Sequence, residues 1–238
     1  MSDYIATYYN PEKLEKAWTV IQRDFLRETG VTLYITLMAT LFAILIGLPL
    51  GVLLVTGEKK GIRPLPSSLM GFLNVLINLL RSIPFIILMV MIIPLTRLIV
   101  GTSLGTVASI VPLTIAAFPF IARLVESSLR EVNPNIIETA QSMGASPMQI
   151  VLHVMLPESV PSLVTNITLA ITTIMGYTAM SGAVGGGGLG KLALAYGYQR
   201  YRYAVLYLAV IVLVVITQII QSFGTWLAAK LDKRLKNK

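Results

Sequence analysis

The chain of 238 residues contains no cysteine and a single histidine, His153. Without thiols it can form no disulfide, no thiolate metal site and no cysteine nucleophile. One imidazole also argues against a histidine metal cluster or a Ser-His-Asp site. Charge is scarce as well, because 13% of the residues are charged against about 25% in an ordinary soluble domain. These absences exclude a plain cytosolic globule.

Long apolar runs take the place of the missing charge. Apolar residues make up 55% of the chain, and its mean hydropathy is +0.76. A helix needs about 20 residues to cross about 30 Å of hydrocarbon. Four runs of at least that length hold no charged residue, and a fifth is interrupted only by Arg81. We therefore predict an all-α, polytopic transmembrane helical bundle with five spans, near residues 31–56, 67–94, 103–123, 159–181 and 203–228.

The remaining segments lie outside the spans. Residues 1–29 are predicted to form an N-terminal amphipathic helix at the membrane interface, because apolar residues recur there at helical spacing between balanced charges. The transmembrane domain covers residues 30–229, and residues 230–238 form a basic tail that we place in the cytoplasm. The net charge of +8 is attributed to contact with anionic lipid headgroups rather than with nucleic acid.

One substantial polar connection, residues 124–158, separates two of the predicted spans. Asn133-Pro134 is typical of a helix start and Gly144 of a helix end. Ser146-Pro147 begins a second helix, which we expect to end at Leu156-Pro157. Two such helices are too short to span a membrane and too apolar to remain alone in water. The connection is therefore predicted to dock onto another protein.

The same connection resembles the cytoplasmic loop signature of ABC importer permeases, which reads EAA, three residues, G, nine residues and I-x-L-P. Here Glu138-Thr139-Ala140, Gly144 and Val154-Met155-Leu156-Pro157 keep that spacing, with Thr139 and Val154 as modest departures. The resemblance implies a coupling helix that sits in a groove of a cytoplasmic ATPase. The residues it assigns to this coupling are Glu138, Thr139, Ala140, Gly144, Ala145, Ser146, Pro147, Val154, Leu156 and Pro157.

Arg81-Ser82-Ile83-Pro84-Phe85, Ser142-Met143-Gly144-Ala145-Ser146-Pro147 and Gly182-Ala183-Val184-Gly185 resemble the methionine-uptake family of these permeases, a type I ABC importer architecture. This resemblance covers residues 31–229 and leaves residues 1–28 unexplained. It implies a homodimer in the cytoplasmic (inner) membrane, two cytoplasmic ATP-binding subunits, which bind ATP and Mg²⁺, and an extracytoplasmic methionine-binding lipoprotein. It also implies that this chain is not an enzyme and carries no catalytic residue, metal or cofactor of its own.

Five residues are candidates for a translocation pathway or gate: Arg81, Pro84, Thr173, Tyr177 and Met180. An arginine inside a span is costly and faces protein, a cavity or the interface. Arg81 is therefore read either as a pathway residue or as one that snorkels to the inner surface. Polar residues along the fourth span, including Asn166 and Thr173, either line the dimer axis or hydrogen-bond neighbouring helices.

The segment Gly185–Lys191 nearly matches a phosphate-binding loop, but Leu192 replaces the Ser or Thr that would hold Mg²⁺. It also follows an apolar helix rather than a strand, so nucleotide binding is rejected. Two interpretations of this segment remain, a flexible outer gate and a plain interhelical turn.

Three alternatives compete with a methionine permease. The first keeps the architecture and changes the cargo to another amino acid or small solute. The second is a secondary transporter, which predicts intramembrane acids and internal repeats, whereas the five predicted spans hold no Asp or Glu. The third is a purely structural membrane subunit, for which the connection 124–158 would tolerate mutation.

Overall fold

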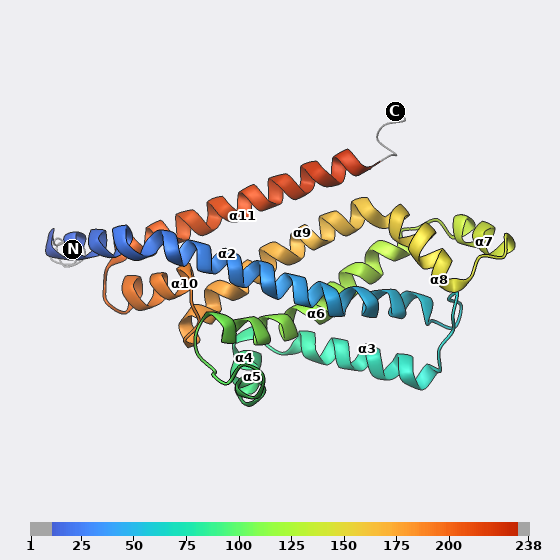
Figure 1. Cartoon of the computed structure of the whole chain (residues 1–238), viewed down its shortest axis with the longest axis horizontal. Coiled ribbons are helices and arrows are strands. Elements are labelled where there is room, and N and C mark those ends of the chain that lie inside the picture. The colour runs from blue at the N-terminus through green and yellow to red at the C-terminus, as the bar shows by residue number, and fades with distance from the viewer. Residues whose placement is uncertain (1–10, 233–238) are drawn as a thin grey trace. The chain divides into compact units, whose positions relative to one another are not determined.

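The computed structural model describes residues 11–232, so residues 1–10 of the predicted N-terminal helix and residues 233–238 of the basic tail lie outside it. Within that range the chain is helical and holds no strand (Figure 1). The elements, in which η marks a π-helical or 3-10 turn, are α2 (Pro11–Thr56), α3 (Ser67–Ser82), α4 (Phe85–Met91), α5 (Ile93–Val100), α6 (Thr106–Arg130), α7 (Pro134–Ser142), α8 (Pro147–Ile150), η1 (Val151–Met155), α9 (Leu156–Ser181), η2 (Gly182–Val184), α10 (Leu189–Lys191), η3 (Leu192–Tyr198) and α11 (Tyr203–Leu231).

Within residues 11–232, four helices are long and apolar enough to cross a membrane, and α3 with α4 makes a fifth if that bent pair is one span. The pair bends by 106° at its break, so the predicted span 67–94 is not one straight helix. Ile83 adopts an extended conformation (φ −79°, ψ 125°), as a residue before proline favours. Pro84 itself offers no backbone N–H to continue the helix.

The N-terminal helix and the first span are continuous, which differs from the predicted boundary at residue 29. The helix α2 runs unbroken from Pro11 to Thr56. Gly30 is the residue near that boundary that disfavours a helix most, and a single glycine costs only about 1 kcal/mol relative to alanine. That cost is too small to end a helix of this length.

The prediction that Leu156-Pro157 ends a helix is wrong. The chain passes from α8 through the π-helical turn η1 directly into α9, which contains Pro157 and Pro161. The backbone N–H of Leu156 donates to the carbonyl of Val151, five residues earlier. A wide π-helical turn of this kind shifts the hydrogen-bond register, so a residue without an N–H can follow it and the helix continues.

The chain divides into two compact units, which are described separately. Unit 1 comprises residues 1–39, 85–114 and 172–219, and unit 2 comprises residues 40–84, 115–171 and 220–238. Unit 1 has a buried apolar cluster from α2, α10, η3 and α11 that includes Phe25, Leu189 and Val205. Unit 2 has one from α2, α3 and α6: Leu54, Met70, Ile77 and Ala122.

Candidate functional site

The connection that the sequence marks as a docking element forms a hairpin in unit 2, defined as residues 133–157 (Figure 1). Its first helix, α7, begins where the sequence predicts. The side chain of Asn133 accepts a hydrogen bond from the backbone N–H of Asn135 at 3.0 Å. Pro134 occupies the first helical position, where its missing N–H leaves no intrahelical bond unmade. A local cap therefore fixes the entry into the hairpin.

The spacing of Ala140 and Gly144 in the signature has a geometric basis at the end of α7. Gly144 has φ +82°, a conformation that glycine adopts without strain. Its N–H donates to the carbonyl of Gln141 at 2.9 Å, and the N–H of Ala145 donates to the carbonyl of Ala140 at 3.1 Å. These two bonds form a Schellman motif, which satisfies the last carbonyls of a helix. Two signature residues, Ala140 and Gly144, thus take part in ending α7.

The second helix of the hairpin begins immediately afterwards with a reciprocal cap. The backbone N–H of Gln149 donates to Ser146 Oγ at 3.4 Å, and the backbone N–H of Ser146 donates to Gln149 Oε1 at 2.8 Å. This capping box precedes Pro147 at the first position of α8. The turn between α7 and α8 is consequently held by backbone hydrogen bonds on the α7 side and by hydrogen bonds from backbone to side chains on the α8 side.

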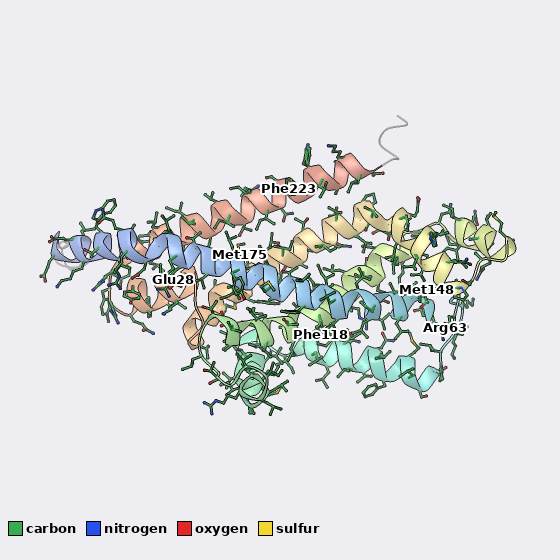
Figure 2. All side chains as sticks on the ribbon, in the orientation of Figure 1. Glu28, Arg63, Phe118, Met148, Met175 and Phe223 are labelled. Atoms are coloured by element: carbon green, nitrogen blue, oxygen red, sulfur yellow. The ribbon has the colours of Figure 1, made fainter. Side chains whose placement is uncertain are left out.

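The hairpin exposes large apolar side chains. Met143 is 83% exposed and Met148 is 64% exposed, and Ile136 and Leu152 are also exposed; Figure 2 labels Met148. Glu138 is exposed between them. Ile136 and Met143 lie outside the candidate spans, and Met148 and Leu152 lie at the start of the candidate span Pro147–Val184. Exposed apolar side chains of this kind are typical of surfaces that another protein or the membrane covers. Of the ten predicted coupling residues, the exposed ones are Glu138, Thr139, Gly144, Ser146, Pro147 and Pro157, and the half-buried ones are Ala140, Ala145, Val154 and Leu156.

Three predicted pathway residues share one face of α9 in unit 1. Thr173 and Tyr177 are half-buried, and Met180 is 46% exposed. The ring of Tyr177 stacks on Phe85 of α4, with centroids 4.8 Å apart and planes 9° apart. Phe85 was not among the predicted pathway residues, although it directly follows Pro84, which was. That adjacency was a signal for including Phe85.

The other two predicted pathway residues belong to unit 2. Arg81 is exposed in the last turn of α3, which begins at Ser67, and Pro84 is exposed at the break after that helix. Asn166 of α9 donates to Ser128 Oγ at 2.8 Å and to the carbonyl of Leu124 at 3.3 Å, both on α6. Of the two readings of the polar residues on α9, the geometry of Asn166 supports hydrogen bonding between helices.

The glycine-rich segment of unit 1 is packed against α2. Glu28, buried on α2 and labelled in Figure 2, accepts a hydrogen bond from the N–H of Gly188 at 2.7 Å. Thr32 Oγ1 accepts one from the N–H of Leu189 at 2.8 Å. Two of the N–H groups that a phosphate would need are therefore already engaged. This occupancy agrees with the rejection of nucleotide binding, and the buried packing favours a turn over a flexible gate.

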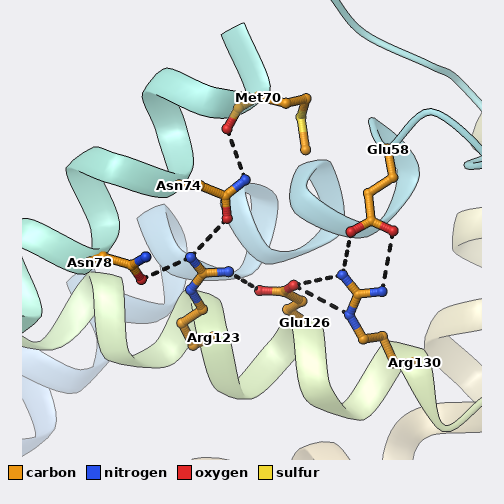
Figure 3. Close-up of polar contacts among 7 residues, drawn as sticks. All are labelled: Glu58, Met70, Asn74, Asn78, Arg123, Glu126 and Arg130. Carbon is orange, nitrogen blue, oxygen red and sulfur yellow. Dashed lines mark hydrogen bonds and ion pairs between the residues drawn. The ribbon is translucent and has the colours of Figure 1, made fainter. Parts of the chain in front are cut away.

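Unit 2 contains a charged network that the sequence reading did not anticipate (Figure 3). Arg123 donates to Glu126, Asn74 and Asn78 at 2.6, 2.8 and 3.0 Å. Arg130 donates to Glu126 at 2.8 Å through Nη2 and to Glu58 at 3.2 Å through Nη1. Spacings of three and four along α6 were a signal for its intrahelical pairs, but no pattern connects Glu58 to them.

The connection between α2 and α3 carries the acidic end of this network. Glu58 lies two residues after the end of α2, outside the candidate spans. The hydrogen bond from Arg130, aided by its charge, lowers the pKa of Glu58 below its ordinary 4.5 against the opposing effect of partial burial. Glu58 is therefore ionised at neutral pH. No group of three or more potential metal ligands occurs within residues 11–232.

Several apolar helices of membrane-spanning length, two of them connected through a capped hairpin, define a polytopic membrane protein. The family of binding-protein-dependent transport system inner membrane components matches residues 47–237 of this chain. The chain belongs to that family.

Individual relatives agree with this assignment. The chain is 47% identical over 219 residues to a Vibrio cholerae protein named as a probable D-methionine transport system permease, which covers 91% of this chain and 96% of that protein. It is 49% identical over 151 residues to the D-methionine transport system permease protein MetI of Escherichia coli K12, 63% of this chain and 69% of that one.

Solved structures give the same picture of the fold. A chain from the inward-facing MetNI methionine ABC transporter superposes with a TM-score of 0.85 at 44% identity, covering 87% of this chain and 96% of that one. A chain of an amino acid ABC transporter matches with a TM-score of 0.69 at 17% identity, a likeness that concerns the fold alone. The predicted all-α importer-permease fold is confirmed.

Proposed function

We propose that this chain is the membrane-spanning permease subunit of an ATP-driven importer of methionine. The names of its relatives support the substrate, since a D-methionine permease protein and a methionine ABC transporter subunit are similar to it over most of its length. The chain supplies a route through the membrane and binds no nucleotide, and ATP hydrolysis resides in a partner subunit that binds ATP and Mg²⁺.

The observation that carries the proposal is the hairpin. Its two caps fix a short rigid element, and its exposed face combines Met143, Met148 and the carboxylate of Glu138. Such a face suits a groove that offers apolar side chains and a basic residue. We propose that the groove belongs to a cytoplasmic ATP-binding subunit, and that the hairpin transmits that subunit's closure to the helices.

The ends of α2 and α6 support one orientation of the chain in the membrane. Glu58, just after α2, bonds to Arg130 at the end of α6, so both helices end on the side of the hairpin. The bent pair of α3 and α4 must then return the chain across the membrane between them. Two further spans, α9 and α11, follow the hairpin. If the hairpin meets a cytoplasmic subunit, the C-terminus is cytoplasmic as well.

The proposed assembly is a homodimer of this chain with two ATP-binding subunits inside and a methionine-binding lipoprotein outside. A transporter of this kind exposes its passage alternately to each side. ATP and the loaded binding protein must each favour a different arrangement of the dimer, because a ligand with equal affinity for both arrangements shifts neither. A zwitterionic solute needs such a passage, since its charges are costly in hydrocarbon.

Reconstitution tests the substrate. The permease, its ATP-binding subunit and its binding protein are placed in proteoliposomes, and uptake of labelled methionine is followed with ATP, without ATP and with a nonhydrolysable analogue. We expect uptake with hydrolysable ATP alone. ATP-dependent uptake of a different amino acid, with none of methionine, would reassign the cargo. Uptake driven by an ion gradient without ATP would indicate a secondary transporter.

Labelling tests the hairpin, and the cysteine-free chain provides a clean background. Met148→Cys in the hairpin and Tyr198→Cys in unit 1 are matched, because these side chains are 64% and 63% exposed. We expect a membrane-impermeant maleimide to reach Met148→Cys only from the cytoplasmic side, and the ATP-binding subunit to protect it. Tyr198→Cys should react equally with or without that subunit. Equal labelling of Met148→Cys in both conditions would contradict docking.

A further inference from the structure

The charged network of unit 2 connects three segments that are distant in sequence. Arg123, Glu126 and Arg130 lie on α6, Asn74 and Asn78 on α3, and Glu58 on the α2–α3 connection (Figure 3). Glu126 bridges the two arginines, because it accepts a hydrogen bond from Arg123 and another from Arg130. The network is a single chain of hydrogen bonds from α3 through α6 to the end of α2.

The charges of this network are balanced and partly shielded from solvent. The Glu126 side chain is 12% exposed and that of Arg123 is 20% exposed. Partly buried ions are stable only when paired, and a paired cluster adds little stability over apolar packing. Glu126 and Arg123 each have such a partner, so the cluster is self-consistent. Because the cluster contributes little to stability, its geometry suits a role in positioning the segments that it connects.

The placement of the network relative to the hairpin indicates what it positions. Arg130 is the last residue of α6, and Asn133, the cap of α7, follows three residues later. A cavity of about 350 Å³ lies between the α2–α3 connection and the hairpin, lined by Lys60 and Ile62 on one side and by Ile137 and Glu138 on the other. Glu58 and Arg130 also line this cavity, and their hydrogen bonds join the α2–α3 connection to the end of α6, three residues before the hairpin begins.

We propose that Glu58 and Arg130 are positioning residues of the coupling mechanism. Their ion pair joins the α2–α3 connection, just beyond the end of α2, to the last residue of α6, just before the hairpin. The hydrogen bonds continue to α3 through Glu126, Arg123, Asn74 and Asn78. A displacement of the hairpin therefore moves α2 and α3 together with α6. This inference rests on the proposed function, because it gives the hairpin's displacement a route into the membrane helices.

Removal of the ion pair should weaken the coupling of ATP hydrolysis to methionine import, and it should leave assembly with the ATP-binding subunit unchanged. In Glu58→Gln the side chain keeps its size and loses its charge, and the hairpin's caps are untouched. We expect the number of ATP molecules hydrolysed per methionine imported to rise between about twofold and fivefold, the factor that corresponds to one exposed ion pair. A merely structural role would lower assembly and both rates in proportion and leave that ratio unchanged.

Two companion variants complete the experiment. Glu131→Gln removes an exposed carboxylate one residue beyond α6 that forms no ion pair within residues 11–232, and its ratio should equal that of the wild type. Arg130→Lys keeps the charge and loses the fork, so its ratio should lie between those of the wild type and Glu58→Gln. A wild-type ratio in Glu58→Gln at normal assembly would overturn the inference.

The wild-type protein separates this inference from the proposed function. If the reconstituted wild type imports no methionine with ATP, the proposed function fails and the inference fails with it. If the wild type imports methionine and Glu58→Gln has the same ratio as Glu131→Gln, only the inference fails. Thermal unfolding of each variant in detergent shows whether a loss of folded protein accounts for a changed rate.

Discussion

The two units of the chain stabilise their polar groups with different kinds of hydrogen bond. In unit 1 Glu28 and Thr32 accept hydrogen bonds from backbone N–H groups of the glycine-rich segment, all of them buried. In unit 2 charged side chains bond to one another, and the outermost pair, Glu58 with Arg130, is about half exposed. Bonds to buried backbone are costly to break, whereas exposed ion pairs are weak.

This difference indicates which contacts cost most stability when a substitution disrupts them. The segment in unit 1 is fixed by close backbone packing, since a Cβ on Gly190 would lie 2.1 Å from the carbonyl oxygen of Ala179. The outer pair in unit 2 contributes near or below about 1 kcal/mol to stability. We therefore expect substitutions in the first arrangement to destabilise the protein more than substitutions in the second.

The largest expected effect comes from filling the close approach in unit 1. Gly190→Ala forces the backbone near Ala179 to shift, which should lower the free energy of unfolding by about 3 kcal/mol. Gly176→Ala on α9 is the control, because no atom beyond the adjoining backbone of its own helix lies within 4 Å of the added methyl group. The control should raise stability by about 0.5–1 kcal/mol. Denaturant titration in detergent measures both, and equal stabilities would show that this segment is not tightly packed.

A smaller effect is expected from removing the carboxylate that holds the segment. Glu28→Ala leaves the buried N–H of Gly188 without its acceptor and should lower the free energy of unfolding by about 1–3 kcal/mol. Glu28→Gln keeps an acceptor oxygen and should lose less than Glu28→Ala. The same denaturant titration ranks the two variants. If they are equally destabilised, the charge rather than the hydrogen bond stabilises the segment.

Sequence patterns anticipated the local features of the hairpin better than the long-range contacts of either unit. The caps at Asn133 and Ser146 depend on residues two or three apart, and both form as predicted. The continuation of the helix through Pro157 depends on a π-helical turn, for which residue type gives no clear signal.

Long-range pairs in the candidate sites had no local signature at all. Glu28 and Gly188 are 160 positions apart, and Arg130 and Glu58 are 72 apart. Glu28 lies just before the run of uncharged residues, so a reading based on uncharged runs excluded it from the membrane part. Tertiary packing then buried it, which helical periodicity and composition do not encode.

The smallest expected effect is the pH dependence of the exposed pair in unit 2. Arg130 lowers the pKa of Glu58 below 4.5 in the folded protein, so the pair contributes stability above that pH and loses it as the pH falls through the lowered pKa. The melting temperature of the wild type should therefore exceed that of Glu58→Gln by a constant, small margin at neutral pH, and the margin should vanish in acid. Other carboxylates titrate in both proteins and cancel. Glu131→Gln should show no such margin at either pH, and a margin for Glu58→Gln that persisted in acid would mean that the contact is not ionic.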